Sequence, residues 1–130
     1  MPCATQNEIN MDEAKKIVAG GSKYYIEVAN MPTTNDALKF IQDSGMIVAP
    51  SKAVNAGGVS TSALEMSQNS MRYSWSFEEV DAKLHGIMKT IYKMSVDAAE
   101  EAGLGYNLVA GANLAGFKKV ADAMMAQGVI

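Results

Sequence analysis

Several features that mark particular classes of protein are scarce in this sequence. Cys3 is the only cysteine among 130 residues, so no disulfide can form within the chain. No run approaches the ~18 apolar residues that a membrane-spanning helix needs. The N-terminus also lacks a charged region followed by an apolar core and a cleavage site. We therefore expect a cytoplasmic protein and exclude a membrane protein.

Positive charge is scarce as well. The chain has 11 lysines and arginines against 14 aspartates and glutamates, which gives a formal net charge of −3. No Lys/Arg cluster of the kind that follows a phosphate backbone is present, so nucleic acid is excluded as a partner. Hydrophobic residues make up 48% and charged residues 19% of the sequence, values close to those of globular proteins. We expect one folded domain.

Residues that would indicate a metal or thiol site lack the necessary neighbours. His85, the single histidine, follows Leu84 in a predicted long helix, and a helix-surface or interface position is favoured over a metal ligand. Cys3 has neither a histidine nor a second cysteine nearby, which favours a buried small residue over a nucleophile. The sequence predicts no metal site.

What the first half of the sequence does contain is the pattern of a βαβ unit. Asn10 is the predicted N-cap of a first helix, with Glu13 as its capping-box partner. Residues 46–49 are apolar without alternation, which is typical of a parallel sheet covered by helices on both faces. The predicted elements are a helix at 10–18, a strand at 23–28, a helix at 33–44 and a strand at 46–49.

The second half is predicted to be helical, at residues 59–73, 76–102 and 113–127. Ser76 and Glu79 have the spacing of a capping box, and Glu79 and Lys83 that of a favourable ion pair. Apolar residues recur at helical spacing and are expected to face the core: Phe77, Val80, Leu84, Ile87, Met88 and Ile91, then Phe117, Val120, Ala121 and Met124. The predicted fold is therefore α/β, a partial Rossmann-like parallel sheet of two to three strands followed by C-terminal helices.

A binding rim is expected where the strands end. In open α/β sheets, ligands bind outside the carboxyl ends of the strands, which places Asn30 and residues 51–55 on one edge. Gly57-Gly58 is interpreted as a turn that opens a helix. The hydroxyl residues of that helix's first turn, Ser62 among them, would then face beyond the strand end, where backbone amides favour an anion.

A phosphate-binding glycine turn is missing. Gly20-Gly21, Gly57-Gly58 and Gly103-Leu104-Gly105 do not follow a strand with G-x-G-x-x-G spacing, and are interpreted as a helix stop, a turn into a helix and a helix-to-helix loop. Residues 1–7 look like a loop that leaves a strand, although no strand precedes them. We expect that an upstream half of the domain is missing, and that this chain alone cannot hold a pyrophosphate.

Four ordered blocks resemble the hexameric, bacterial-type NAD(P)-dependent glutamate dehydrogenases. They are Pro2-Cys3-Ala4-Thr5-Gln6-Asn7-Glu8, Ala29-Asn30-Met31-Pro32-Thr33-Thr34, the stretch from Lys52 to Met66, and Gly111-Ala112-Asn113 with Gly116-Phe117 and Ala121-Asp122-Ala123-Met124. The related leucine and phenylalanine enzymes differ after Gly57-Gly58-Val59. The resemblance implies that residues 1–130 are the C-terminal part of a dinucleotide-binding domain, with a partial βαβ unit at 1–55 and a helical segment at 56–130.

The resemblance also implies roles for particular residues. Ser62 would bond the distal carboxylate of glutamate and Val59 would line its side chain. Asn30 and Asn55 would lie near the nicotinamide and its ribose, and Ala4 and Thr5 in a loop along the cofactor. From its position alone, Ser62 is by default a helix-start residue, and the alternatives for Asn30 and Asn55 are a turn residue and a cap. Lys52 is expected to be structural or interfacial.

The implied activity is reversible oxidative deamination of L-glutamate to 2-oxoglutarate and ammonium with NAD or NADP, in a homohexamer. In this family a lysine and an aspartate of another domain carry the acid/base work, so no catalytic residue is assigned and the isolated chain is predicted to be inactive. Four positions depart from the family pattern: Val28, Ser51, Val54 and Ala63. The alternative is a free-standing, non-catalytic interaction module.

Overall fold

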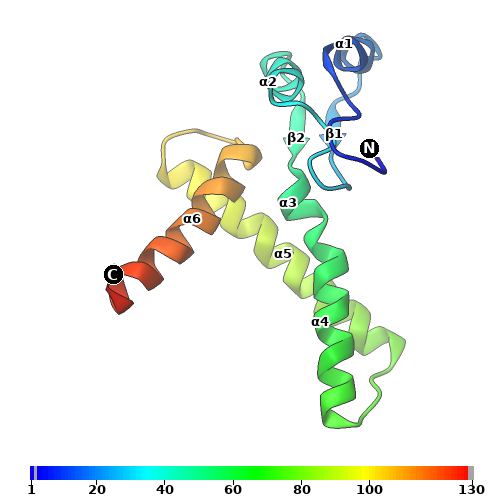
Figure 1. The fold of residues 1–130 in the computed structure, drawn as a ribbon, viewed down its shortest axis with the longest axis vertical. Coiled ribbons are helices and arrows are strands. Elements are labelled where there is room, and N and C mark those ends of the chain that lie inside the picture. The colour runs from blue at the N-terminus through cyan, green and yellow to red at the C-terminus, as the bar shows by residue number, and fades with distance from the viewer. Residues whose placement is uncertain (2, 129–130) are drawn as a thin grey trace.

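The chain folds into an α/β part followed by a set of long helices (Figure 1). The computed structural model describes residues 1 and 3–128. Its elements are α1 (Met11–Ala19), β1 (Tyr24–Ile26), α2 (Asn35–Asp43), β2 (Ile47–Ala49), α3 (Ser51–Val54), α4 (Ala56–Met71), α5 (Phe77–Glu101) and α6 (Leu108–Gln127).

The sheet of the described residues consists of β1 and β2, which run parallel with Tyr25 opposite Val48. α2 connects the two strands, as a parallel pair requires. An isolated parallel bridge between Ile9 and Thr33 lies outside these strands. The predicted α/β fold with a partial parallel sheet is therefore confirmed.

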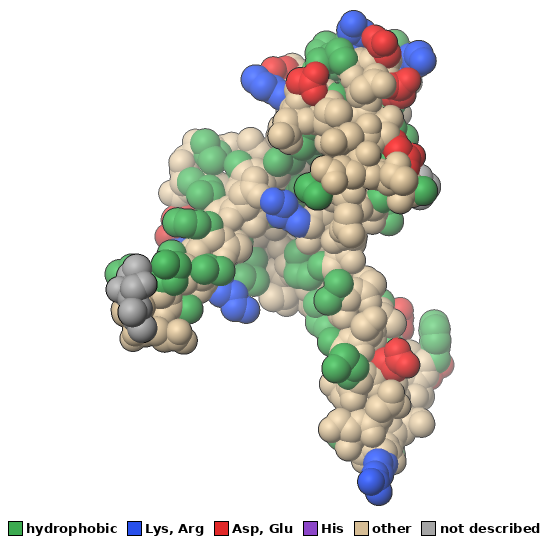
Figure 2. Space-filling view, in the orientation of Figure 1, with side chains coloured by type: hydrophobic (Ala, Val, Ile, Leu, Met, Phe, Trp, Pro, Cys, Tyr) green, Lys and Arg blue, Asp and Glu red, His purple; other side chains and the backbone are tan. Residues whose placement is uncertain are grey.

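The core lies between this sheet and the helices α1 and α2. Ala14 of α1 and Ala37 and Ile41 of α2 are fully buried against Tyr25 and Val48. The Tyr25 hydroxyl is buried with them and lies 2.7 Å from the Thr33 Oγ1. Charged side chains gather over the outer surface of α1 and α2 (Figure 2), where Lys39 pairs with Asp43 at 2.8 Å.

Residues 46–49, from which helices on both faces are predicted, are buried or half-buried in the structure, whereas β1 is covered on one face only. Burial in β1 alternates, because Tyr25 points into the core while Tyr24 and Ile26 are 56% and 46% exposed. Side chains of neighbouring strand residues point to opposite faces, so the face of β1 that bears Tyr24 and Ile26 is open, whereas Ile47 and Ala49 of β2 are half-buried. The strands therefore carry more apolar side chains than the described residues bury.

The helix caps follow the sequence in part. Asn10 caps α1 by accepting from the Asp12 N–H at 2.8 Å, but Glu13 lies 3.8 Å from Lys16 and does not complete a capping box. At α5 the capping box of Ser76 and Glu79 is confirmed. The ion pair expected for Glu79 is replaced by Lys83 lying over the Trp75 ring, 4.6 Å from its centroid.

Two helices begin earlier than predicted. α4 begins at Ala56 instead of 59, directly after the short helix α3. Gly57 and Gly58 therefore lie in the first turn of α4 and do not form a turn before it. α6 begins at Leu108 instead of 113, because the Asn107 side chain caps it by accepting from the Ala110 N–H at 3.0 Å. Gly103 and Gly105 form the predicted helix-to-helix loop, with φ of 71° and 59°.

α5 and α6 pack against each other at Gly111, which is buried. A Cβ atom at this position would lie 1.8 Å from the Ser95 carbonyl oxygen, so the two backbones approach as closely as glycine allows. The apolar stripe of α5 is at most half-buried, and Phe77 is 80% exposed. The predicted core face of α6 is wrong, since Phe117 is 71% exposed and Val120 and Met124 are exposed too.

Candidate functional site

The loops that follow β1 and β2 meet at one edge of the sheet. The Asn55 Nδ2 donates a hydrogen bond to the Asn30 Oδ1, which joins the end of the β1 loop to the end of α3. Parallel strands end at the same edge, and this contact confirms the expected common rim. The Asn55 side chain makes no capping bond to α4, so its amide serves the pair instead.

Glu27 is a buried carboxylate at this edge that the sequence interpretation missed. It directly follows β1, is only 3% exposed, and its Oε2 accepts a hydrogen bond from the Ser51 N–H at 3.0 Å. Its own N–H donates to the Ala49 carbonyl at 3.1 Å. The available signal was a single acidic residue directly after a strand whose other side chains are apolar or aromatic.

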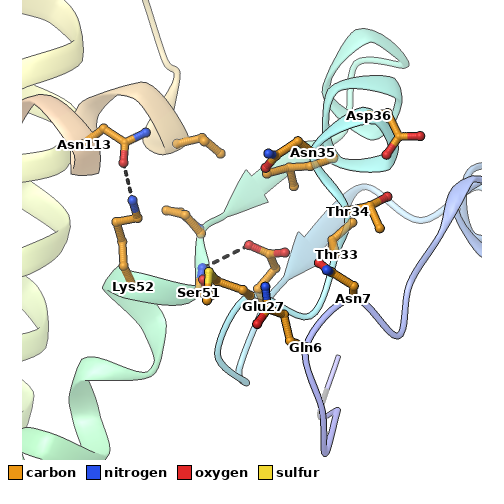
Figure 3. Close-up of a pocket in the computed structure, with 14 residues that line it drawn as sticks. Gln6, Asn7, Glu27, Thr33, Thr34, Asn35, Asp36, Ser51, Lys52 and Asn113 are labelled. Carbon is orange, nitrogen blue, oxygen red and sulfur yellow. Dashed lines mark hydrogen bonds between the residues drawn. The ribbon is translucent and has the colours of Figure 1, made fainter.

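A polar pocket of about 660 Å³ opens beside Glu27. Its wall comes from the loops after both strands, the first turn of α2 and the side of α6 (Figure 3). The Lys52 Nζ donates to the Asn113 Oδ1 across this pocket and so connects α3 with α6. This bond, to a partner 61 residues away, agrees with the structural or interfacial role that the sequence predicts for Lys52.

Ala4 and Thr5 belong to a loop that folds around the Glu8 carboxylate. Glu8 accepts from the Ala4 N–H at 2.7 Å, from the Thr5 N–H and from the Thr5 hydroxyl at 2.9 Å. The Thr5 backbone and side-chain bonds hold the pKa of Glu8 below its usual value, because they favour the charged form. The Asn7 N–H donates to the Met31 carbonyl at 3.0 Å, so this loop lies beside the one after β1.

Val59 and Ser62 lie on α4, outside the pocket of 660 Å³. Their positions follow Asn55 by four and seven residues, which places all three along one side of the helix. Both side chains are exposed, Val59 by 73%. Ser62 is seven residues beyond the N-cap Asn55, in the second turn. The prediction that it belongs to the first helical turn is wrong.

The other candidate positions are simpler. His85 is exposed on α5, as predicted. Cys3 was expected to be buried, but it is only half-buried. Within residues 1 and 3–128, no group of three or more His, Cys, Asp or Glu side chains could hold a metal ion. None of the helices in this part of the chain is long and apolar enough to cross a membrane.

Comparison with known proteins decides the family. The family model for glutamate/leucine/phenylalanine/valine dehydrogenase matches residues 1–128. The chain belongs to this dehydrogenase family. It is 68% identical over 130 residues to the NAD-specific glutamate dehydrogenase of Clostridium symbiosum and 55% identical over 130 residues to the NADP-specific glutamate dehydrogenase of Escherichia coli K12.

The fold agrees with the sequence similarity. A solved glutamate dehydrogenase superimposes on the 130-residue chain with a TM-score of 0.91 at 68% identity, and the match covers 99% of the 130-residue chain. The chain spans 29% of the length of both curated relatives and of that solved structure. It therefore corresponds to somewhat less than a third of each relative.

Proposed function

We propose that this chain is the C-terminal part of the coenzyme-binding domain of a glutamate dehydrogenase. The full-length enzyme would convert L-glutamate and NAD or NADP reversibly to 2-oxoglutarate, ammonium and the reduced cofactor. The 68% identity to an NAD-specific glutamate dehydrogenase, over 99% of this chain, carries the proposal. The relatives named above include both NAD-specific and NADP-specific enzymes, so the proposal covers either cofactor.

The contact between Asn30 and Asn55 supports a cofactor role for this edge. Each amide offers both a donor and an acceptor, and only one of each is used in the contact between them. The remaining groups suit a carboxamide and ribose hydroxyls, which also present donors and acceptors. The cofactor supplies the hydride acceptor, and in our proposal the two asparagines orient it.

Val59 and Ser62 extend this edge along α4 toward the substrate. We assign Val59 to the aliphatic part of glutamate and the Ser62 hydroxyl to a hydrogen bond with its distal carboxylate. Both side chains are exposed and share one helix side with Asn55, so a ligand could contact all three. Ala4 and Thr5 would line the cofactor through their methyl groups, because Glu8 already holds both N–H groups and the Thr5 hydroxyl.

No residue of this chain is assigned as a catalytic acid or base. Those groups would come from the substrate domain of the full-length enzyme, as the family resemblance implies. The open face at Tyr24 and Ile26 supports a larger protein, because a further element can bury these side chains. Among the described residues, the edge of β1 beside these side chains pairs only with Met1, whose nitrogen donates to the Ile26 carbonyl at 2.5 Å and whose carbonyl accepts from the Val28 N–H at 3.3 Å, and a further strand could extend this pairing.

The division of the chain at residue 55 is part of the proposal. Residues 1–55 would complete the βαβ unit of the coenzyme domain, and residues 56–130 would form its helical segment. A homohexamer is the proposed assembly, supported by the apolar side chains that α6 exposes, among them Phe117 and Met125. The cytoplasm is the proposed location, supported by the single cysteine.

The test is a steady-state assay of the full-length protein encoded by the source gene. We expect glutamate-dependent reduction of NAD or NADP, and sequencing upstream of the codon for Met1 should reveal a glycine-rich phosphate turn. A full-length protein that begins at Met1 and shows no such activity would contradict the proposal. It would favour the alternative, a non-catalytic interaction module.

A further inference from the structure

Glu27 is the buried charge that no part of the proposed reaction uses. It is 3% exposed, and none of the ion pairs among the described residues includes it. A buried carboxylate without a cationic partner is costly, so its place depends on the hydrogen bonds that it accepts. The bond that the structure shows comes from the backbone N–H of Ser51 at 3.0 Å.

This bond fixes the start of α3 relative to the end of β1. Ser51 is the first residue of α3, and the Ser51 carbonyl accepts from the Asn55 N–H at 2.8 Å. Because α3 is a single turn, a shift of Ser51 moves Asn55 with it. Asn55 then donates to Asn30, which lies three residues after Glu27. Three hydrogen bonds therefore link Glu27, Ser51, Asn55 and Asn30, and the chain between Glu27 and Asn30 closes the ring.

We propose that Glu27 is a positioning residue that holds Asn55 against Asn30 and so fixes the nicotinamide-side amides of the enzyme. This inference rests on the proposed function, because it takes the two asparagines to face the cofactor. Glu27 acts through the Ser51 backbone and contacts neither reactant. A charged acceptor gives a stronger bond to an N–H group than a neutral one does, which explains why a carboxylate occupies this position.

The first test uses substitutions in the full-length enzyme. Glu27→Ala removes the acceptor and should raise the KM for the cofactor about tenfold, the scale of a lost hydrogen bond to a charged group. The KM for glutamate should change less. Glu27→Gln keeps the size and one acceptor oxygen, and should restore most of the cofactor affinity. A cofactor KM in Glu27→Ala equal to that of the wild type would overturn the proposal.

A backbone substitution tests the same bond from the other side. Ser51→Pro removes the donor N–H, together with the hydroxyl, at the first helical position, where proline is accepted, and Pro50 before it already has an extended backbone. We expect a raised cofactor KM although Glu27 is intact. Ser51→Ala keeps the N–H and should have a smaller effect. Equal effects of the two Ser51 variants would count against the proposal.

A double-mutant cycle separates positioning from general stability. If Glu27 acts through Asn55, adding Glu27→Ala to Asn55→Ala should raise the cofactor KM little further, whereas independent effects would multiply. Glu79→Ala is the matched control, because Glu79 also accepts one backbone N–H, from Ser76 at 2.8 Å, but in the first turn of α5. It should lower the Tm and leave the cofactor KM unchanged.

The outcomes distinguish this inference from the proposed function. Multiplying effects in the cycle would overturn the role of Glu27 while leaving the enzyme assignment intact. An Asn55→Ala variant with the wild-type cofactor KM would overturn the assignment of the amide pair, and the positioning role with it. An inactive full-length protein would overturn the proposed function itself.

Discussion

Asn30 and Asn55 show how single residues of the candidate site can be predicted. They are separated by 25 positions, and a parallel sheet with known strand ends suffices to place both on one edge. Glu27 was not predicted, because its role depends on the position of the Ser51 N–H, which appears only when α3 has formed. The polar residues at strand ends can thus be predicted from the sequence, whereas their hydrogen-bond partners can be identified only when the loop conformations are known.

Ser62 offers the most direct test of the substrate assignment. Ser62→Ala in the full-length enzyme should raise the KM for glutamate and relax selectivity against shorter or uncharged amino acids. The expected loss in kcat/KM is about 10- to 100-fold, the range for a hydrogen bond to a carboxylate. An unchanged kcat/KM for glutamate would remove this assignment. Ser67→Ala, further along the same helix, is the matched control.

Tyr25 is expected to make the stability of the fold depend on pH in the alkaline range. Burial raises the pKa of this phenol above its ordinary value of ~10, because the charged form is poorly solvated. The folded state therefore holds the proton more tightly than the unfolded state, and this contribution is complete below pH ~10 and lost as the pH rises through the folded pKa. The Tm should fall above about pH 10, and less steeply in Tyr25→Phe.

The same substitution has a cost at neutral pH. Tyr25→Phe removes the partner of the Thr33 hydroxyl, 2.7 Å away, and leaves that hydroxyl buried. We expect a loss of about 1 to 3 kcal/mol in the free energy of unfolding. The double variant Tyr25→Phe with Thr33→Val removes both polar groups and should recover part of this loss. A single variant as stable as the wild type would contradict the role of the bond.

At the scale of elements, the sequence predicts which helices and strands exist better than where they begin. The order of the predicted elements is confirmed, because capping residues and apolar spacing are local signals. The early start of α6 was missed, since the helix predicted at 113–127 leaves out Gly111. In the structure it lies inside the helix, where its missing side chain makes room for the Ser95 carbonyl. The one-turn helix α3 is too short for a periodic signal.

Gly111 is therefore expected to be the least replaceable glycine of α6. Gly111→Ala should destabilise the protein by about 1 to 3 kcal/mol or more, because the new methyl group collides with backbone atoms of α5. Gly116→Ala in the same helix is the matched control, since nothing lies within 4 Å of its added Cβ. It should be neutral or stabilise by up to about 1 kcal/mol through helix propensity. Thermal unfolding of both variants would measure the difference, and equal Tm values would contradict the close contact.

At the scale of the molecule, burial was the least predictable property. The apolar stripes on α5 and α6 and the apolar strand at 46–49 predict a larger core than the described residues form. Sequence periodicity shows that a face is apolar but does not show which element covers it. The mismatch is greatest on α6 and on the outer face of β1, where large side chains remain exposed.

This mismatch predicts how the isolated 130-residue chain behaves. We expect no glutamate-dependent reduction of NAD or NADP, because no acid/base group for the reaction is assigned to it. We also expect concentration-dependent association, since Tyr24, Ile26, Phe117 and Met125 are exposed. Activity measurements and analytical ultracentrifugation would test both points. Reduction of either cofactor by the isolated chain would overturn the assignment of this chain as an incomplete part of the enzyme.

The contact at Gly111 also has a mechanical consequence. Two helices whose backbones touch cannot slide past each other or separate without breaking that contact, so α5 and α6 turn as one rigid body. Lys52 attaches this body to α3 through Asn113 of α6. We therefore expect any rotation of the helical pair to act, through Lys52, on the single turn that precedes Asn55.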